Sequence, residues 1–179
     1  MRDEGLSRFV KTLEKSDENS RLERAARLRF LVKEYGRERW LAFTGGETAT
    51  RFFEEARDAF LNGQYCATLL LCHGVITQQL VGVFREWGRD ELADSDAEDL
   101  YRAARDEGVI SATDFSIYNN VRKIRNAYVH PPGLGSKHHL ARRAIVGRAS
   151  IREVNARDAH LALRALFLML NRPRFSAPV

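Results

Sequence analysis

Apolar positions along most of the chain recur every three or four residues, which is the spacing of an amphipathic helix. The longest such stretch is residues 64–87, where one line holds Cys66, Leu69, Leu70, His73, Ile76, Leu80, Val83, Phe84 and Trp87. The same rhythm marks residues 6–15, 20–35, 37–43, 48–61, 95–107, 114–130 and 155–170. No stretch alternates convincingly with the period of two expected of a strand. The pattern therefore predicts an all-α protein, an up-and-down helical bundle around the helix at 64–87.

Several of these helices carry a start signal, a serine followed three residues later by an acid. The pairs are Ser20–Glu23, Ser95–Glu98 and Ser111–Asp114. The last helix is predicted to open at Asn155, and its residues 161–170 are apolar on nearly all sides. A helix with so little polar surface is expected to be covered by its own bundle, with a second subunit as a further cover.

The helix at 114–130 carries the candidate chemistry. Its apolar stripe is Ile117, Val121, Ile124 and Tyr128, and the opposite face holds Asn119, Arg122, Asn126 and His130. Arg125 lies on the flank, about 140° from His130 around an ideal helix. Pro131 should push His130 off the regular helical path. An arginine, an amide and an imidazole are the groups that RNA cleavage without a metal requires, to hold the phosphate, to position a group and to move a proton.

Residues 125–130 read RNAYVH, and this sequence resembles the motif of the HEPN family (higher eukaryotes and prokaryotes nucleotide-binding domains). That motif is an arginine, often followed by a polar residue, with a histidine four to six residues on, which Arg125, Asn126 and His130 match. The resemblance extends over residues 48–172. It implies an all-α bundle of HEPN type, a kind that often dimerises, with the two motifs meeting in a groove. Many members are metal-independent ribonucleases of toxin or defence systems, and others have lost activity.

Two positions depart from the family pattern. Members often carry an acidic residue in the central helix near the motif arginine, whereas the corresponding residue here is Thr77. One subset carries a tyrosine two residues after the histidine, as a target of modification, whereas this chain has Pro132. The resemblance therefore does not indicate what holds Arg125 in place. It also does not support regulation by modification of a tyrosine after the histidine.

Charge is distributed unevenly along the chain. Residues 1–121 contain 17 Lys and Arg against 22 Asp and Glu, a net −5, and residues 122–179 contain 12 against 2, a net +10, which together give the overall +5. A basic segment that begins at the motif favours a polyanion such as RNA as the ligand. A general preference for arginine, which makes up 24 of the 29 basic residues, is the alternative. Such a preference explains why arginine is used instead of lysine, but it does not explain why residues 122–179 contain so few acidic residues.

Residues 131–154 are predicted to form a basic loop that contacts phosphates, with a disordered excursion as the alternative. The predicted RNA-binding residues, in this loop and just before it, are Arg122, Lys123, Lys137, His138, His139, Arg142, Arg143 and Arg148. His138 and His139 are also candidates for a second proton carrier. His73 is interpreted as a hydrogen-bonded core residue, and Cys66 and Cys72 as packing residues without metal-ligand spacing. No metal site or cofactor is predicted.

The chain is interpreted as residues 1–46, an N-terminal helical extension, followed by the HEPN-like bundle at 47–179. The charged N-terminus is unlike a signal peptide, the apolar runs at 65–76 and 159–170 are too short to span a bilayer, and the two cysteines suit a reduced compartment. We therefore expect a cytoplasmic protein without a membrane segment.

The preferred hypothesis is a cytoplasmic endoribonuclease that leaves a 2′,3′-cyclic phosphate. Arg125, Asn126 and His130 would be catalytic, RNA (tRNA among the candidates) the substrate, and a homodimer the source of two histidines. The alternative is a non-catalytic module that binds nucleic acid, a nucleotide or a partner protein, in an antitoxin or adaptor role. An antitoxin or regulatory protein is a further expected partner.

Overall fold

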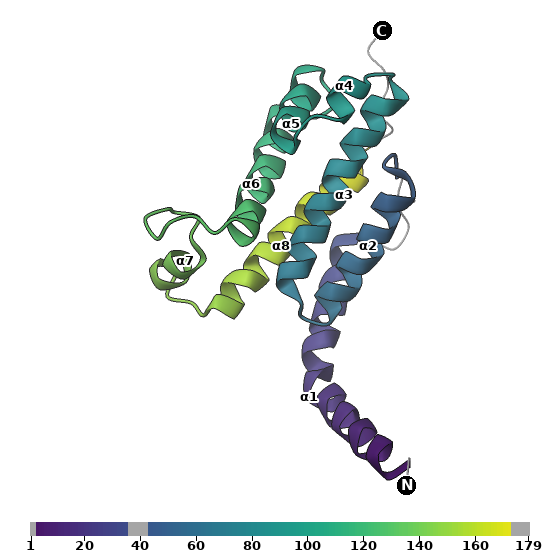
Figure 1. Ribbon diagram of the computed structural model, residues 1–179, viewed down its shortest axis with the longest axis vertical. Helices are drawn as coiled ribbons and strands as arrows, with labels where there is room; N and C mark the ends of the chain where they lie inside the picture. Colours follow the sequence, from purple (N-terminus) through teal and green to yellow (C-terminus); the bar gives the residue numbers. More distant parts are fainter. Residues whose placement is uncertain (1–2, 36–42, 173–179) are drawn as a thin grey trace. The chain divides into compact units, whose positions relative to one another are not determined.

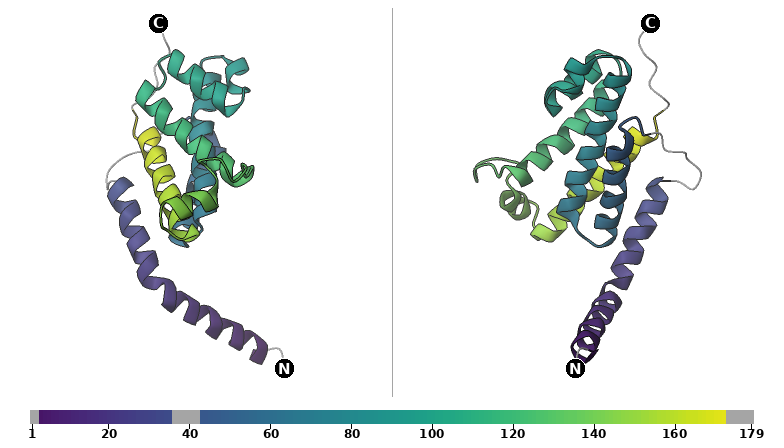
Figure 2. Two further views of the ribbon diagram at one scale, coloured as in Figure 1. Left: turned by 90° about the vertical axis from the view of Figure 1, so that its left-hand side faces the viewer. Right: turned by 45° about the vertical axis from the view of Figure 1, so that its right-hand side comes forward.

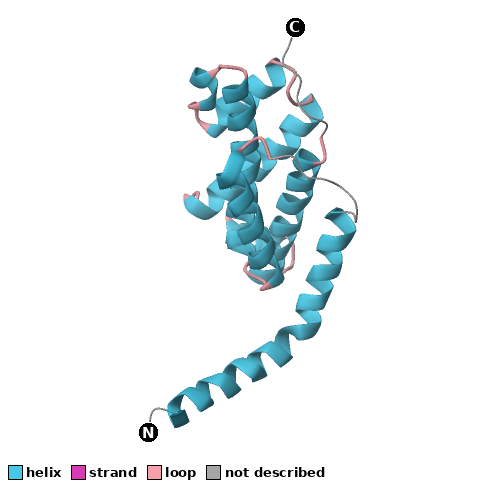
Figure 3. Ribbon diagram, turned by 90° about the vertical axis from the view of Figure 1, so that its right-hand side faces the viewer, coloured by secondary structure: helices cyan, strands magenta, loops and turns pink. Residues whose placement is uncertain are grey.

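The computed structural model describes residues 3–35 and 43–172, and every regular element in these ranges is an α-helix (Figure 3). The all-α prediction is confirmed. The chain divides into two units, Met1–Arg37 and Glu38–Val179. The first contains α1 (Asp3–Tyr35), and the second contains the other helices. The helix predicted at 37–43 lies outside the described residues except for Phe43, which is not helical.

The described part of the first unit, residues 3–35, is one helix, so the prediction of two helices at 6–15 and 20–35 is wrong. Ser20, the predicted start of the second helix, lies inside α1, and its hydroxyl donates to the carbonyl oxygen of Asp17 at 3.3 Å. A serine inside a helix commonly satisfies its hydroxyl in this way. Neither proline nor glycine lies between residues 15 and 20, so the backbone has no reason to break there.

The second unit is a bundle of long helices around α3 (Figure 1). Its helices are α2 (Gly46–Leu61), α3 (Tyr65–Glu86), α4 (Asp90–Ala93), α5 (Ala97–Asp106), α6 (Ala112–Val129), α7 (Leu140–Val146) and α8 (Ile151–Leu170). α3 contacts α2, α6 and α8, and α4 and α5 pack at its C-terminal end. α7 and the loop before it project where α6 ends and α8 begins (Figure 2). The loop between α6 and α7 is therefore carried at one end of the bundle.

The core is built on α3 and α8. Most of the predicted line on α3 is buried, from Leu69 to Phe84, although Cys66 and Leu70 are exposed. The expectation that the apolar run at 65–76 is too short to span a bilayer is not met, because α3 as a whole is long and apolar enough to do so; 61% of its most apolar 18-residue stretch is buried inside the protein. α8 buries ten residues against its own bundle. Its burial therefore does not require a second subunit.

The turn before α2 is fastened to α3 by contacts that the hydrophobic pattern does not indicate. A Cβ atom at Gly82 would collide with the carbonyl oxygen of Thr44, so only glycine allows this close approach. The Thr44 hydroxyl donates to the carbonyl oxygen of Gln79 at 2.8 Å, and the Gly45 N–H donates to the Gln79 Oε1 at 2.9 Å. These bonds anchor the start of α2 on the central helix.

The start signals are only partly right. Ser111 and Asp114 form the predicted capping box, and α6 begins directly after Ser111. The cap of α5 is Asp96 rather than Ser95, because the Asp96 carboxylate accepts from two backbone N–H groups of the first turn. α8 begins at Ile151, four residues before the predicted start at Asn155.

The prediction of one long loop at 131–154 is also wrong. α7 lies within it, and a second capping box, Ser150 with Glu153, starts α8 inside its C-terminal part. The segment without helix after α6 is therefore reduced to residues 130–139. This shorter loop is held between the end of α6 and the start of α7.

Candidate functional site

A pocket of about 770 Å³ extends along α6 and onto the loop that follows it. Its lining residues are Phe115, Ser116, Ile117, Asn119, Asn120, Arg122, Lys123, Asn126, Ala127, His130, Pro132, Ser136, Lys137 and His138. This volume is typical of sites that bind small molecules or parts of larger ligands. We refer to it as the α6 pocket.

The four polar residues predicted to share one face of the motif helix, Asn119, Arg122, Asn126 and His130, all line the α6 pocket. The buried residues of α6 include Tyr118, Val121, Ile124 and Ala127, and Ala127 also touches the pocket. The predicted apolar stripe is thus only partly right, because Ile117 lines the pocket and Tyr128 is half-buried. The shared face follows from the helical period alone, because residues three or four apart are neighbours on a helix surface. Of the predicted RNA-binding residues, Lys123, Lys137 and His138 also line the pocket.

His130 is the C-cap of α6, and its side chain is exposed. Its backbone angles, φ −127° and ψ 81°, take the chain off the helical path, as expected before Pro131. The His130 N–H still donates to the carbonyl oxygen of Asn126 at 2.7 Å, which fixes the backbone at this point. The imidazole has no hydrogen bond to a described residue. Its nitrogens are therefore free to meet a ligand.

Arg125 does not line the α6 pocket. It is half-buried, and its guanidinium donates to the Oδ1 of Asn126 at 3.0 Å. No acid among the described residues pairs with Arg125, in keeping with the uncharged Thr77 on α3. The Thr77 hydroxyl instead lies 3.0 Å from the Tyr101 hydroxyl. Arg125 therefore orients the amide of Asn126, whose NH₂ group remains available as a donor.

His73 lies in the core beneath this part of α6. Its side chain is 3% exposed, and its Nε2 has no hydrogen-bond partner among the described residues. Burial lowers the pKa of His73 to about 4, with smaller contributions from the positive charges of Arg125 and Arg122. The predicted core location is confirmed. The predicted hydrogen bonding is wrong for Nε2, since the side chains around the ring provide no partner for it.

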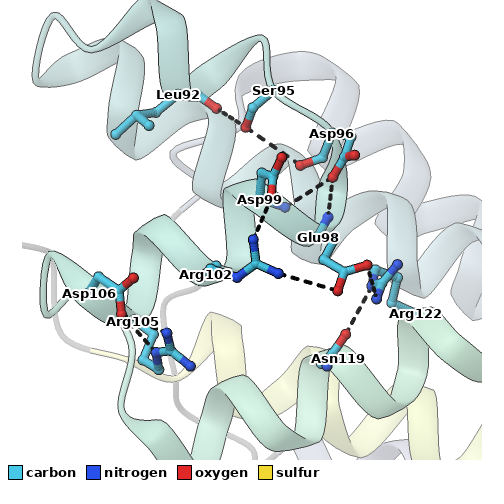
Figure 4. Close-up of polar contacts among 10 residues, drawn as sticks. All are labelled: Leu92, Ser95, Asp96, Glu98, Asp99, Arg102, Arg105, Asp106, Asn119 and Arg122. Carbon is cyan, nitrogen blue, oxygen red and sulfur yellow. Dashed lines mark hydrogen bonds and ion pairs between the residues drawn. The ribbon is translucent and has the colours of Figure 1, made fainter.

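Arg122 lies in the α6 pocket, but its charge is already paired. Its guanidinium is 2.7 Å from a carboxylate oxygen of Glu98 on α5, and its Nε–H donates to the Oδ1 of Asn119 at 2.9 Å. The Arg122 side chain is only 12% exposed. Figure 4 shows Glu98 between Arg122 and Arg102. Arg122 is thus fixed in one orientation, with a carboxylate where a phosphate would otherwise bind.

The other end of the α6 pocket is cationic. Lys123 and Lys137 are exposed and line the pocket, and neither forms an ion pair with a described acid. Burial lowers the pKa of His138, and the positive charges of Lys137, Arg143 and Lys123 add to this effect. These effects favour the neutral form of His138 next to two lysines. An anion would meet positive charge here without a competing carboxylate.

The remaining predicted RNA-binding residues lie outside the pocket. Arg142 and Arg148 are exposed, and the Arg142 guanidinium donates to the carbonyl oxygen of Gly135. Arg148 has a φ of 46°, an uncommon conformation for a residue other than glycine. His139 occupies the N-cap position of α7 without a side-chain capping bond, and its Nδ1 is buried without a hydrogen-bond partner among the described residues. These contacts shape the loop and α7 rather than the pocket wall.

Arg143 is occupied by an interaction that sequence reasoning missed. Its guanidinium forms two hydrogen bonds with the buried carboxylate of Asp158 on α8. The Tyr128 hydroxyl donates to the same carboxylate at 2.8 Å, and burial together with the Asp158 charge raises the pKa of Tyr128. One feature of the sequence could have indicated this pairing, namely that Asp158 is one of only two acidic residues after residue 121. This network ties α6, α7 and α8 together and so holds the loop that carries Lys137 and His138.

Among the described residues, no group of three or more His, Cys, Asp or Glu side chains could hold a metal ion. Cys66 is exposed, Cys72 is buried, and both are free thiols. Comparison of the chain with family models, curated proteins and solved structures finds no match.

Proposed function

We propose that the protein is a cytoplasmic, metal-independent endoribonuclease of HEPN type whose α6 pocket binds RNA. One observation carries this proposal. His130, exposed and without a hydrogen bond on its ring, lines the same pocket as Asn126, two unpaired lysines and the neutral His138. Cleavage of an RNA backbone without a metal requires a base, an acid and positive charge around one phosphate. This arrangement supplies all three groups.

In the proposed reaction the ribose 2′-oxygen attacks the neighbouring phosphorus, and a base accepts the proton of that hydroxyl. A new bond forms between the 2′-oxygen and phosphorus, and the bond from phosphorus to the 5′-oxygen of the next nucleotide breaks. An acid donates a proton to this leaving oxygen. The products are a 2′,3′-cyclic phosphate and a 5′-hydroxyl, so no water, metal or redox partner is consumed.

The two proton carriers have two proposed sources. Within one chain, the lowered pKa of His138 keeps its imidazole neutral and suited to act as the base, while His130 acts as the acid. In the homodimer that the family resemblance implies, a second copy of His130 would take one of these roles. His138→Ala distinguishes the two, because it abolishes cleavage if His138 is the base and leaves cleavage intact if two copies of His130 take both roles.

Negative charge grows on the phosphate oxygens during the reaction. Lys123 and Lys137 lie where they would stabilise it. The Asn126 NH₂ group, oriented by the Arg125 guanidinium, would donate a hydrogen bond to the same oxygens. Arg125 therefore acts as a positioning residue, rather than the phosphate-binding cation that the motif suggests. Arg122 is left out of this role because Glu98 already pairs with it.

The test is incubation of the purified protein with total RNA and with tRNA in EDTA, followed by analysis of the RNA ends. His130→Ala is expected to abolish cleavage, and Arg125→Ala to reduce it strongly. Arg157→Ala, an exposed arginine of the same basic segment outside the pocket, is the charge-matched control and should cleave normally. Thermal melting of each variant verifies folding. Cleavage that persists in His130→Ala, or that EDTA removes, would contradict the proposal.

A second candidate is a non-catalytic module that binds RNA, a nucleotide or a partner protein, as an antitoxin or adaptor would. The specific observation in its favour is that Arg125 lies outside the pocket wall. In this case the wild-type protein binds RNA in the assay above but leaves it intact, or a partner protein rather than RNA occupies the pocket. If the wild-type protein binds RNA but does not cleave it, the protein is a binding module rather than a nuclease.

A further inference from the structure

The two ends of the α6 pocket differ in chemistry. The end formed by Lys123, His130, Lys137 and His138 is cationic. The end formed by Phe115, Ser116, Asn119 and Asn120 contributes amide, hydroxyl and aromatic groups without a net charge. This second end lies along the N-terminal half of α6, a helix that packs against α5. We propose that this end is a nucleobase subsite, at which Asn120 recognises an unpaired adenine. This inference rests on the proposed RNA-binding function of the pocket.

A phosphate is disfavoured at this end because of the acidic first turn of α5. Glu98 lies 2.7 Å from Arg122 and is 43% exposed, and Asp96 and Asp99 belong to the same turn (Figure 4). The carboxylate of Glu98 cancels the charge of Arg122, the only cation that lines the pocket between Phe115 and Arg122. An RNA strand would thus place its phosphates at the lysine end and a neutral group here.

The amides at this end are suited to read a base edge. Arg122 fixes the orientation of Asn119 by donating to its Oδ1, which leaves the Asn119 NH₂ group as a donor. Asn120 is exposed and has no hydrogen bond to a described residue, so it offers both an acceptor and a donor. An asparagine amide pairs in bidentate fashion with the N6 amino group and N7 of adenine. This pairing selects the base.

An aromatic ring lines the same pocket as these amides. Phe115 lines the pocket, and the guanidinium of Arg105 lies 4.7 Å from the centroid of its ring. Unpaired RNA bases are commonly bound by stacking on aromatic rings or guanidinium planes. Asn120 precedes His130 by ten residues, which is roughly 15 Å along the helix, or about four nucleotides of a stacked strand. The base that is read should therefore lie within about four nucleotides of the cleaved phosphate.

The test uses the His130→Ala protein, which retains the subsite and leaves RNA uncut, with labelled hexanucleotides of A, C or U. Fluorescence anisotropy in EDTA should give about tenfold tighter binding for the adenine oligomer. Asn120→Ala in this background should remove the preference. Asn120→Asp should shift it towards cytosine, whose amino group donates to a carboxylate. Asn19→Ala, an exposed asparagine of α1, is the matched control and should leave the preference unchanged.

Three outcomes would overturn the subsite while RNA binding stands. They are equal binding of the oligomers, a preference for a base other than adenine, and an adenine preference that survives Asn120→Ala. Failure of every oligomer and of total RNA to bind would instead overturn the proposed function of the whole pocket. The failure of the subsite and the failure of the proposed function are thus separate results.

Discussion

Lowering the pH from 7 to 5 should destabilise the bundle through His73. Burial, with the positive charges of Arg125 and Arg122, lowers the pKa of this histidine from 6.5 to about 4 in the folded protein. In the unfolded chain its pKa returns to 6.5, so the unfolded state binds the proton more tightly. The stability contributed by neutral His73 is therefore fully present above pH 6.5 and is lost as the pH falls towards 4.

The size of the effect follows from these two pKa values. At pH 5 the unfolded chain is almost fully protonated at this site while the folded protein is mostly neutral, so the free energy of unfolding falls by about 2 kcal/mol relative to pH 7. Few carboxylates titrate in this window, because their ordinary pKa values lie near 4. Most of the loss that His73 causes should therefore be measurable before general acid denaturation begins.

The measurement is urea unfolding, followed by circular dichroism at pH 7 and pH 5, of the wild type and of His73→Leu. The variant replaces an imidazole whose Nε2 has no partner, and the apolar side chain is expected to be tolerated at pH 7. Its stability should fall by about 2 kcal/mol less than that of the wild type between the two pH values. If both proteins lose the same free energy, His73 does not have the lowered pKa that this reasoning requires.

Three further changes test the contacts that build the site. Asp158→Leu leaves Arg143 without its carboxylate and should lower the free energy of unfolding by about 3 kcal/mol in urea titrations, with a smaller loss when Arg143→Met is added. Ser150→Ala removes the capping box of α8 and should lower it by about 1 kcal/mol in the same titrations. Glu98→Gln releases Arg122 for phosphate and should steepen the slope of log Kd for RNA against log salt by about 0.7. An unchanged stability or slope would contradict the role assigned to that contact.

The sequence could predict the elements that depend on neighbouring residues. The helical class, the central helix and the start of α6 all follow from apolar spacing or from a capping box within four residues. The position of His130 at the end of α6 follows from Pro131 in the same way. Predictions from neighbouring residues were wrong where one pattern fits two structures. In α1 the hydroxyl of Ser20 bonds to a carbonyl group inside the helix, whereas the serine start signal predicted that a new helix begins there.

The parts of the site that could not be predicted depend on packing between distant segments. Glu98 and Arg122 are 24 positions apart, and their contact exists only because α5 lies against α6. The pairing of Arg143 with Asp158 likewise requires α7 to pack on α8. The motif spacing placed Arg125 beside Asn126 but could not give the direction of its side chain. Side-chain pairing across helices therefore changed the expected roles of Arg122 and Arg143, and a bond within α6 changed that of Arg125.

In the proposed reaction His130 moves a proton during RNA cleavage, in the pocket it shares with Asn126, Lys123, Lys137 and His138. The most direct measurement is end analysis of RNA treated in EDTA with the wild type or with His130→Ala, both verified as folded. We expect 2′,3′-cyclic phosphate and 5′-hydroxyl ends from the wild type and intact RNA from the variant. Equal cleavage by the two proteins, or intact RNA with both, would contradict it.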